Sequence, residues 1–234
     1  MKTTVLPRAG TLAAAADTIA ALLEEKPDAA LAVSAGESCL ALYDELAARC
    51  AAGRLDLSWA LFFALTEYEG LSPDDPHSCR ALLAGRLAAP CGIPVEHVRF
   101  LSAADADSYD AEIAAVGGLD MAVLDIGING RFGFNEPVSS YDSRTHRQKL
   151  ADRTREELAA AFGGEEAVPA YGLTAGVKTV VEARQILVIS LGESTADAVF
   201  KMRYARTDGL VPAAFLQLPM YVHVYLDEQA ASKL

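Results

Sequence analysis

Short runs of apolar residues alternate along the chain with longer segments in which apolar positions recur at helical spacing. The short runs are apolar almost throughout, and they span residues 29–34, 59–65, 121–127, 185–191 and 220–226. Runs of this length suit strands that are buried on both faces of a parallel sheet. The segments between them predict helices over residues 11–25, 38–52, 78–87, 107–116, 149–162, 175–183 and 194–206.

This alternation of strands and helices predicts an α/β fold with a doubly wound, mostly parallel sheet and helices on both faces, similar to a Rossmann fold. We expect residues 1–234 to form one domain. Ligands of such sheets bind at the carboxyl ends of the strands. The search for function therefore starts with the loops that follow the strands, at residues 35–39, 66–76, 127–137 and 192–195.

Composition and charge narrow the classes of partner. The formal net charge is −12, so the chain repels phosphate backbones, and we expect no nucleic-acid partner. A nest of backbone N–H groups could still hold one small anion. The chain has neither an apolar run long enough to span a membrane nor a signal-peptide pattern. Its four cysteines form no C-x-x-C pair. We expect a cytoplasmic protein with reduced thiols and no membrane partner.

The segment after the third apolar run combines turn residues with polar side chains. Residues 125–137 read DIGINGRFGFNEP, just beyond a predicted buried strand. Glycine and asparagine are typical of turns, so an ordinary turn-rich loop is one interpretation. The alternation of polar groups with two phenylalanines, which need burial, favours a binding or catalytic site. We expect this segment to form one wall of a cleft.

The same segment resembles the signature of glucosamine-6-phosphate deaminases, in which D-G-H is followed after two residues by F-N-E-P. The closing residues 134–137 match that ending outright. Residues 34–43 (SAGESCLALY), 65–71 (LTEYEGL) and 172–176 (GLTAG) resemble other motifs of this family in the same order. The related 6-phosphogluconolactonases share the fold but not the F-N-E-P ending. The resemblance thus favours the amino-sugar branch, which includes galactosamine-6-phosphate isomerases.

The resemblance implies a reaction that converts an amino-sugar phosphate to a ketose 6-phosphate and ammonium. Such chemistry needs a carboxylate base, a histidine that opens the sugar ring and donors for the phosphate, but no metal or organic cofactor. Glu136 keeps the signature's glutamate, whereas Thr66 stands at the position of the base and Arg131 at that of the histidine. Asn129 stands in place of an aspartate. Glu67 is the neighbouring carboxylate that could replace the base.

These substitutions change the chemistry that the site can perform. A threonine hydroxyl has too high a pKa to act as a carboxylate base, and arginine stays protonated at neutral pH. In the loop that resembles the family's phosphate loop, Gly36 and Ser38 keep the turn and the hydroxyl, but Glu37 adds a negative charge. Thr195 stands where the family has a phosphate-binding lysine. Three further residues of the 125–137 segment complete the predicted substrate-binding set: Gly127, Gly130 and Asn135.

The sequence therefore leaves more than one function open. The chain could be an amino-sugar-phosphate isomerase or deaminase with an altered active site. It could instead be a catalytically silent or repurposed member that binds a sugar or acts as a regulator. The acidic balance and Glu37 suggest a third option, another reaction on a non-phosphorylated or cationic ligand. In each case we expect a small sugar or sugar phosphate as ligand and no metal, because the histidines lack ligand spacing. A homo-oligomeric state stays open.

Overall fold

The main sheet of the computed structural model is entirely parallel. The structure covers residues 1–234 and describes all of them except residues 104–107. In the described residues the sheet has the strand order β1-β10-β9-β6-β2-β3-β5. The strands are β1 (Lys2–Leu6), β2 (Ala30–Val33), β3 (Leu61–Ala64), β5 (Val98–Arg99), β6 (Met121–Leu124), β9 (Gln185–Ser190) and β10 (Val222–Asp227). The predicted α/β class with a mostly parallel sheet is confirmed.

Two hydrophobic cores lie on opposite faces of this sheet. Along β6, Ala122 and Leu124 pack into one core, whereas Met121 and Val123 pack into the other. Side chains of a strand alternate between its faces, and both faces are covered here, so the central strands are apolar throughout. This burial explains why continuous apolar runs predicted these strands.

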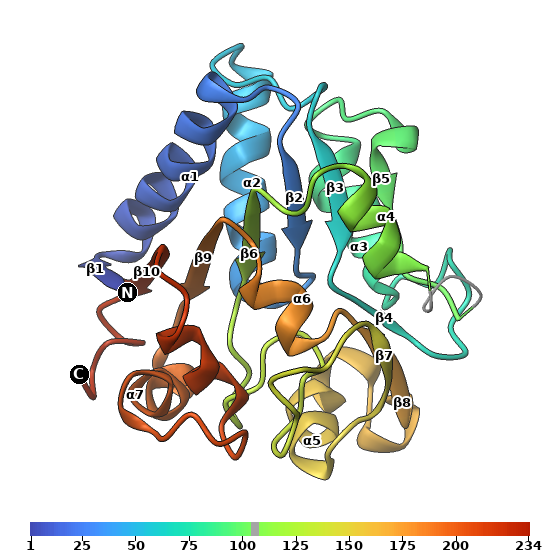
Figure 1. Ribbon diagram of the computed structural model, residues 1–234, viewed down its shortest axis with the longest axis vertical. Helices are drawn as coiled ribbons and strands as arrows, with labels where there is room; N and C mark the ends of the chain where they lie inside the picture. The colour runs from blue at the N-terminus through green and yellow to red at the C-terminus, as the bar shows by residue number, and fades with distance from the viewer. Residues whose placement is uncertain (104–107) are drawn as a thin grey trace.

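Helices cover both faces of the sheet, as Figure 1 shows. One face is covered by α1 (Arg8–Glu25), α2 (Glu37–Ala51) and α3 (Cys79–Leu83), which continues as the π-helical turn η1 (Ala84–Ala88). The other face is covered by α4 (Tyr109–Ala115), α6 (Val177–Val181), α7 (Ala196–Tyr204) and the 3-10 turn η5 (Pro212–Gln217). The predicted helix over residues 107–116 begins at Asp107, which lies outside the described residues.

A small antiparallel sheet lies beyond the carboxyl ends of the central strands. It has the order β4-β8-β7 and consists of β4 (Thr66–Tyr68), β8 (Tyr171–Thr174) and β7 (His146–Lys149). The helix α5 (Asp152–Phe162) and the turn η3 (Glu165–Ala167) follow β7. In Figure 1 the arrows of β2 and β3 point toward this end of the molecule. Residues 66–76 were expected to be a loop, but their first residues form β4, which is too short to show a pattern.

The predicted apolar runs correspond to β2, β3, β6, β9 and β10, with ends displaced by up to three residues. The second run was predicted to be buried from residue 59, yet Trp59 precedes β3 and is 68% exposed. The edge strands β1 and β5 were not predicted, because edge strands are short or carry polar residues. The remaining 3-10 turns are η2 (Val95–His97) and η4 (Glu193–Thr195).

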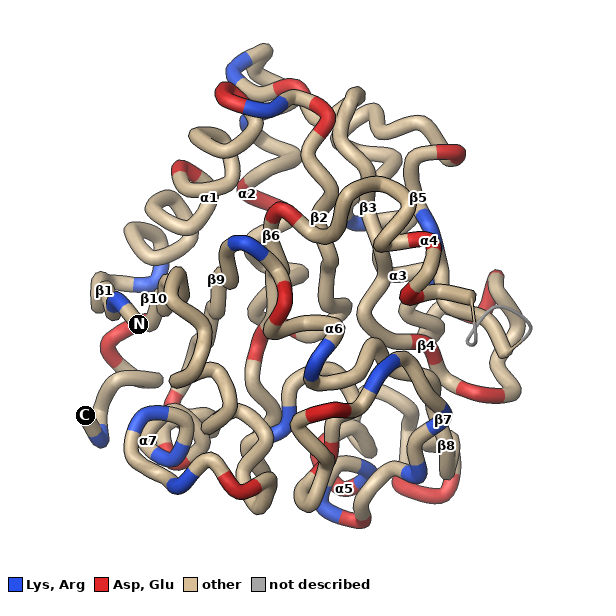
Figure 2. The backbone as a smooth tube through the Cα atoms, viewed as in Figure 1, with Lys and Arg blue, Asp and Glu red and all other residues tan. Residues whose placement is uncertain are grey.

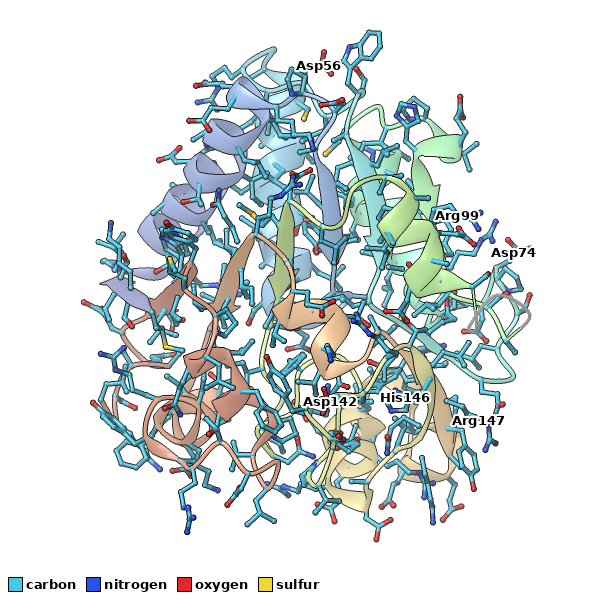
Figure 3. The ribbon with its side chains drawn as sticks, viewed as in Figure 1. Asp56, Asp74, Arg99, Asp142, His146 and Arg147 are labelled. Carbon is cyan, nitrogen blue, oxygen red and sulfur yellow. The ribbon has the colours of Figure 1, made fainter. Side chains whose placement is uncertain are left out.

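Charged residues of both signs are interspersed over the fold in Figure 2. A surface cluster on and before β7 illustrates this: Arg147 pairs with Glu69 at 2.7 Å, and Lys178 pairs with Asp142 at 2.9 Å. Figure 3 labels Asp142, His146 and Arg147 in this region. Such exposed pairs contribute little to stability. In the described part of the chain, no helix is long and apolar enough to cross a membrane.

Candidate functional site

A cavity of about 510 Å³ lies where the carboxyl ends of β2, β3, β6 and β9 meet. Its walls come from the segments that follow these strands, and residues 157–162 of α5 close it on the remaining side. Parallel strands all present their carboxyl ends at one edge of a sheet, so the loops after them converge. The loops in which we expected chemistry therefore contribute to one cavity.

The cavity brings together most of the predicted substrate-binding residues but few of the carboxylates. The predicted residues that line it are Gly36, Glu37, Ser38, Thr66, Gly127, Arg131 and Thr195. The predicted residues that are not part of its lining are Glu67, Asn129, Gly130, Asn135 and Glu136. The only predicted carboxylate on the described lining is thus that of Glu37, which is exposed.

Arg131 is held by its neighbours through all three of its guanidinium nitrogens. Its Nε donates to the hydroxyl of Thr154 at 3.1 Å, and its Nη1 donates to the carbonyl of Gly133 at 2.8 Å. Its Nη2 donates to Glu157 at 3.2 Å. The side chain is only 12% exposed. Gly127 lets it approach, because a Cβ at residue 127 would lie 2.8 Å from the arginine side chain. Arg131 therefore presents a fixed positive charge at the cavity wall.

Thr66 is a buried hydroxyl on the cavity wall. It begins β4, is 4% exposed, and its Oγ1 lies 3.3 Å from the thiol of Cys79. Burial raises the pKa of the Cys79 thiol, and the negative charge of Glu67 adds to this effect. Neither group can accept a proton at neutral pH as a carboxylate would, because the hydroxyl and the neutral thiol are both weak acids here.

The buried Glu136 and the half-buried Asn129 form a pair that is not part of the cavity lining. The amide of Asn129 donates to Oε2 of Glu136 at 2.8 Å, and the backbone N–H of Ala151 donates to Oε1 at 3.2 Å. Asn129 also donates to the hydroxyl of Thr154. Glu136 is 3% exposed. Its carboxylate thus joins the 125–137 segment to the start of α5.

Glu67 turns toward the beginning of α3. Its carboxylate accepts hydrogen bonds from the backbone N–H groups of Tyr68, Cys79 and Arg80 at 2.8 to 3.0 Å. Burial is the largest influence and raises the pKa of Glu67, although these donors act in the opposite direction. The side chain lines a second cavity of about 580 Å³, together with Leu71 and Phe100. As a strand residue next to Thr66, it points away from the cavity that Thr66 lines.

Asp125, which we did not predict as a site residue, lies against the loop 34–38. The hydroxyl of Ser34 donates to its Oδ1 at 2.8 Å, and a Cβ on Gly36 would overlap its carboxylate. Burial raises the pKa of Asp125, whereas Ser34, Arg131 and the backbone N–H of Ser38 lower it. A carboxylate directly after a buried parallel strand was the signal available in the sequence.

The hydroxyls of Ser38 and Thr195 both form hydrogen bonds within the chain. Ser38 is buried, and its Oγ accepts the N–H of Leu191 at 3.1 Å. Thr195 donates to the carbonyl of Gly192 at 2.9 Å and accepts from Ser190 at 2.8 Å. These bonds join the start of α2 to the turn after β9. They fix the shape of the cavity floor.

Aromatic residues and α5 complete the cavity. Tyr68 packs on Phe134 with ring centroids 5.0 Å apart, and on Phe162 at 5.2 Å. His77 stacks on the same Phe162 at 4.8 Å and is bonded to Asp75. Glu157 faces Arg131 from α5, and burial raises its pKa. No residue of α5 was among the predicted site residues. In the sequence of an amphipathic helix, the few residues that face a cavity look like the other residues of the same face.

The other predicted residues of the 125–137 segment shape the backbone. Gly130 has φ +84°, and a Cβ there would lie 2.7 Å from Val211. This positive φ favours glycine. Asn135 is fully buried and donates to the carbonyls of Phe132 at 3.2 Å and Ala175 at 2.9 Å. The segment thus folds into a compact loop around buried Phe132. Within the described residues, no cluster of three or more His, Cys, Asp or Glu could hold a metal ion.

The fold and the cavity define the class of protein: a parallel α/β sheet with a ligand-sized cavity at the carboxyl ends of its strands. The sequence model of the family "Glucosamine-6-phosphate isomerases/6-phosphogluconolactonase" matches residues 8–221. The chain therefore belongs to this family.

Individual relatives agree with this assignment. The chain is 38% identical to the glucosamine-6-phosphate deaminase of Mycolicibacterium smegmatis, over 100% of this chain and 93% of the relative. It is 38% identical to that of Streptomyces coelicolor, over 94% and 87%. Among solved structures, a monomeric glucosamine-6-phosphate deaminase has a TM-score of 0.96 and 31% identity, with 100% of both chains covered. The 6-phosphogluconolactonase of Leishmania guyanensis has a TM-score of 0.80 at 18% identity, with 100% and 98% covered, and supports the fold alone.

Proposed function

We propose that this chain binds a sugar in the cavity between the loop 34–38 and α5, as a repurposed family member that does not isomerise or deaminate amino-sugar phosphates. The observation that carries the proposal is the pair Thr66 and Arg131 on the cavity wall. They occupy the positions at which the resemblance led us to expect a carboxylate base and a ring-opening histidine. The substitutions at these two positions support a role in binding a sugar without this chemistry.

The aldose–ketose step requires a base that removes a proton from C2 of the opened sugar and returns it to C1. The hydroxyl of Thr66 has too high a pKa for this task, and the guanidinium of Arg131 carries no removable proton at neutral pH. Among the acidic groups expected from the resemblance, Glu136 keeps its identity, but it is bonded to Asn129 and lies outside the cavity lining. The arrangement therefore favours binding without proton transfer.

A sugar suits the shape and lining of the cavity. Its volume of about 510 Å³ is in the range of small-molecule sites. Rings of Tyr68, Phe134 and Phe162 provide apolar surface, while Arg131 and Asp125 provide fixed polar groups. Sugars combine apolar C–H faces with hydroxyl edges, and a wall of this mixed kind matches both.

Deamination of an amino-sugar phosphate is the second candidate function. It is favoured by the similarity to glucosamine-6-phosphate deaminases and by the carboxylates of Asp125 and Glu157, which line the cavity and have raised pKa values. A carboxyl with a raised pKa is a suitable general base if it reaches the reacting carbon. In that case Asp125 or Glu157 would take the place of the missing base.

Ammonium release separates the two candidates. The protein is incubated with glucosamine 6-phosphate and, separately, with galactosamine 6-phosphate, and the released ammonium is measured. In a second experiment, calorimetry measures the binding of sugars that carry no phosphate. We expect sugar binding without ammonium release above the rate without protein. Release that is lost in Asp125→Asn or Glu157→Gln, but kept in the exposed control Asp28→Asn, would overturn the proposal and support the second candidate.

A further inference from the structure

The start of α2 offers a site for an anion. Within the loop 34–38, Gly36 is the N-cap of α2. Because glycine has no side chain, the cap residue cannot accept from the first N–H groups of the helix. Unpaired N–H groups and the helix dipole attract negative charge to such an end. The loop also supplies the hydroxyl of Ser34. A phosphate group would be held by this combination of donors.

The carboxylate of Asp125 already occupies this position. It accepts the hydroxyl of Ser34 at 2.8 Å, and it interacts with the backbone N–H of Ser38, in the first turn of α2. It also lies so close to Gly36 that a Cβ there would overlap it. Asp125 comes from the end of β6, and β2 pairs directly with β6, so the sheet itself delivers the carboxylate to the loop. The anion site is filled by a group of the chain.

The other charges on the cavity lining also disfavour a ligand phosphate at this position. The described lining of the cavity carries the carboxylates of Glu37, Asp125 and Glu157, against the single guanidinium of Arg131. That guanidinium is bonded to Glu157, and Glu37 stands beside Gly36. Among the described residues of the lining there is no lysine, and the turn after β9 contributes the neutral Ser194 and Thr195. A phosphate dianion entering here would meet net negative charge, which costs binding free energy.

We infer that Asp125 is an internal replacement for a ligand phosphate, and that the cavity selects a non-phosphorylated amino sugar whose ammonium group is attracted by its carboxylates. This inference rests on the proposed sugar-binding function and adds the class of ligand. The carboxylate of Asp125 fills the space of a phosphate. It also places a negative charge where the N–H groups of the loop 34–38 would otherwise attract an anion. Asp125 is thereby the residue that determines specificity, and Glu37 strengthens it from the mouth of the cavity.

Calorimetry with four probes tests the inference: glucosamine, glucose, glucosamine 6-phosphate and inorganic phosphate, each at neutral pH in a phosphate-free buffer. For the wild type we expect glucosamine to bind more tightly than glucose, and both more tightly than glucosamine 6-phosphate. We expect no binding of inorganic phosphate. The variant Asp125→Gly should gain roughly tenfold or more in affinity for glucosamine 6-phosphate, because it removes both the charge and the obstruction.

Two further variants keep the test decisive. Asp125→Asn removes the charge but keeps the shape, so its gain should be smaller than that of Asp125→Gly. Asp28→Asn makes the same change of net charge at an exposed position near the amino end of β2, and should change nothing. Circular dichroism and the unfolding midpoint show whether each variant is folded.

The outcomes separate this inference from the proposed function. Wild-type protein that binds glucosamine 6-phosphate more tightly than glucosamine would overturn the inference and leave sugar binding intact. Wild-type protein that binds no sugar would overturn the proposed function. In that case the binding of inorganic phosphate would still test the inference. A folded Asp125→Gly variant that gains no affinity for phosphate would show that Asp125 does not replace a ligand phosphate.

Discussion

Arg131 and Glu157 join the loop after β6 to the helix α5 through a bond from Nη2 to Oε2 of 3.2 Å. Both side chains are mostly shielded from solvent, at 12% and 24% exposure. Ion pairs in such settings are sensitive to the loss of one partner, because the other is left with an uncompensated charge. This pair therefore fixes the geometry between the two walls of the cavity.

The first prediction concerns the shape of the Arg131 side chain. Arg131→Lys keeps the charge but cannot reach Thr154, Gly133 and Glu157 together, since an ammonium lacks the planar fork. We expect a loss of about 1–3 kcal/mol in the free energy of unfolding. Urea denaturation measures it. The matched control is Arg153→Lys on the exposed surface of α5, which should change stability by less than about 0.5 kcal/mol.

The second prediction concerns Glu136, whose expected role was catalytic. Glu136→Gln replaces an acceptor oxygen with an amide, so one of the donors from Asn129 and Ala151 loses its partner. A buried donor without a partner costs about 1–3 kcal/mol, and we expect the free energy of unfolding to fall by this amount. Glucosamine affinity should stay unchanged by calorimetry. The exposed control is Glu166→Gln. If the wild type releases ammonium from an amino-sugar phosphate and Glu136→Gln loses this activity without losing stability, Glu136 would be a catalytic residue.

The third prediction concerns the pH dependence that Asp125 confers. Burial raises the pKa of Asp125 above its unfolded value, so its contribution to stability is full below the unfolded pKa. That contribution is lost as pH rises through the folded pKa. The variant Asp125→Asn does not titrate, so its stability relative to the wild type should increase between about pH 4 and neutral pH.

Urea midpoints of the wild type and of Asp125→Asn, measured at both ends of this pH range, give the difference directly. A gap that stays constant with pH would show that folding does not shift the pKa of Asp125, and a wild type that gains on the variant toward neutral pH would show that the folded protein favours the ionised carboxylate. Either result contradicts the prediction. The Asp28→Asn variant serves as the control for general effects of net charge.

The fourth prediction concerns the thiol of Cys79 on the cavity wall. Burial raises its pKa, and the thiolate is the reactive form, so alkylation should be slow in the folded protein. We expect mass spectrometry to find Cys79 unmodified by iodoacetamide at neutral pH, whereas the half-buried Cys50 reacts faster. In denaturant both should react at similar rates. Rapid modification of Cys79 in the folded protein would mean that the cavity opens or that the thiol is more acidic than its burial implies.

The sequence predicted the central sheet well because its strands are buried on both faces. Residues 121–124 and 185–190 have no polar position except Gln185 and Ser190 at the ends of β9. Strands that are buried on both faces of a sheet need apolar residues at every position. The short strands β4, β7 and β8 gave no such signal. Their pairing depends on contacts between distant segments, such as Thr66 with Thr174, which a local pattern cannot reveal.

The candidate site was predicted in part. The convergence of loops at the carboxyl ends of the strands follows from topology, so Gly36, Ser38, Thr66 and Arg131 could be placed together. The directions of individual side chains could not be predicted. Glu67 faces the start of α3 instead of the cavity, and the contact of Asp125 with the loop 34–38 arises only from the pairing of β2 with β6.

Solvent deuterium exchange at C2 of glucosamine 6-phosphate tests most directly whether this cavity transfers protons. The wild type is incubated with the sugar phosphate in deuterium oxide, and proton magnetic resonance follows the signal of the C2 proton. We predict that the signal keeps its intensity, as it does with heat-inactivated protein. Loss of that signal with wild-type protein, if it disappears in the folded variants Asp125→Asn or Glu157→Gln, would contradict the account, because it would show a working base in this cavity.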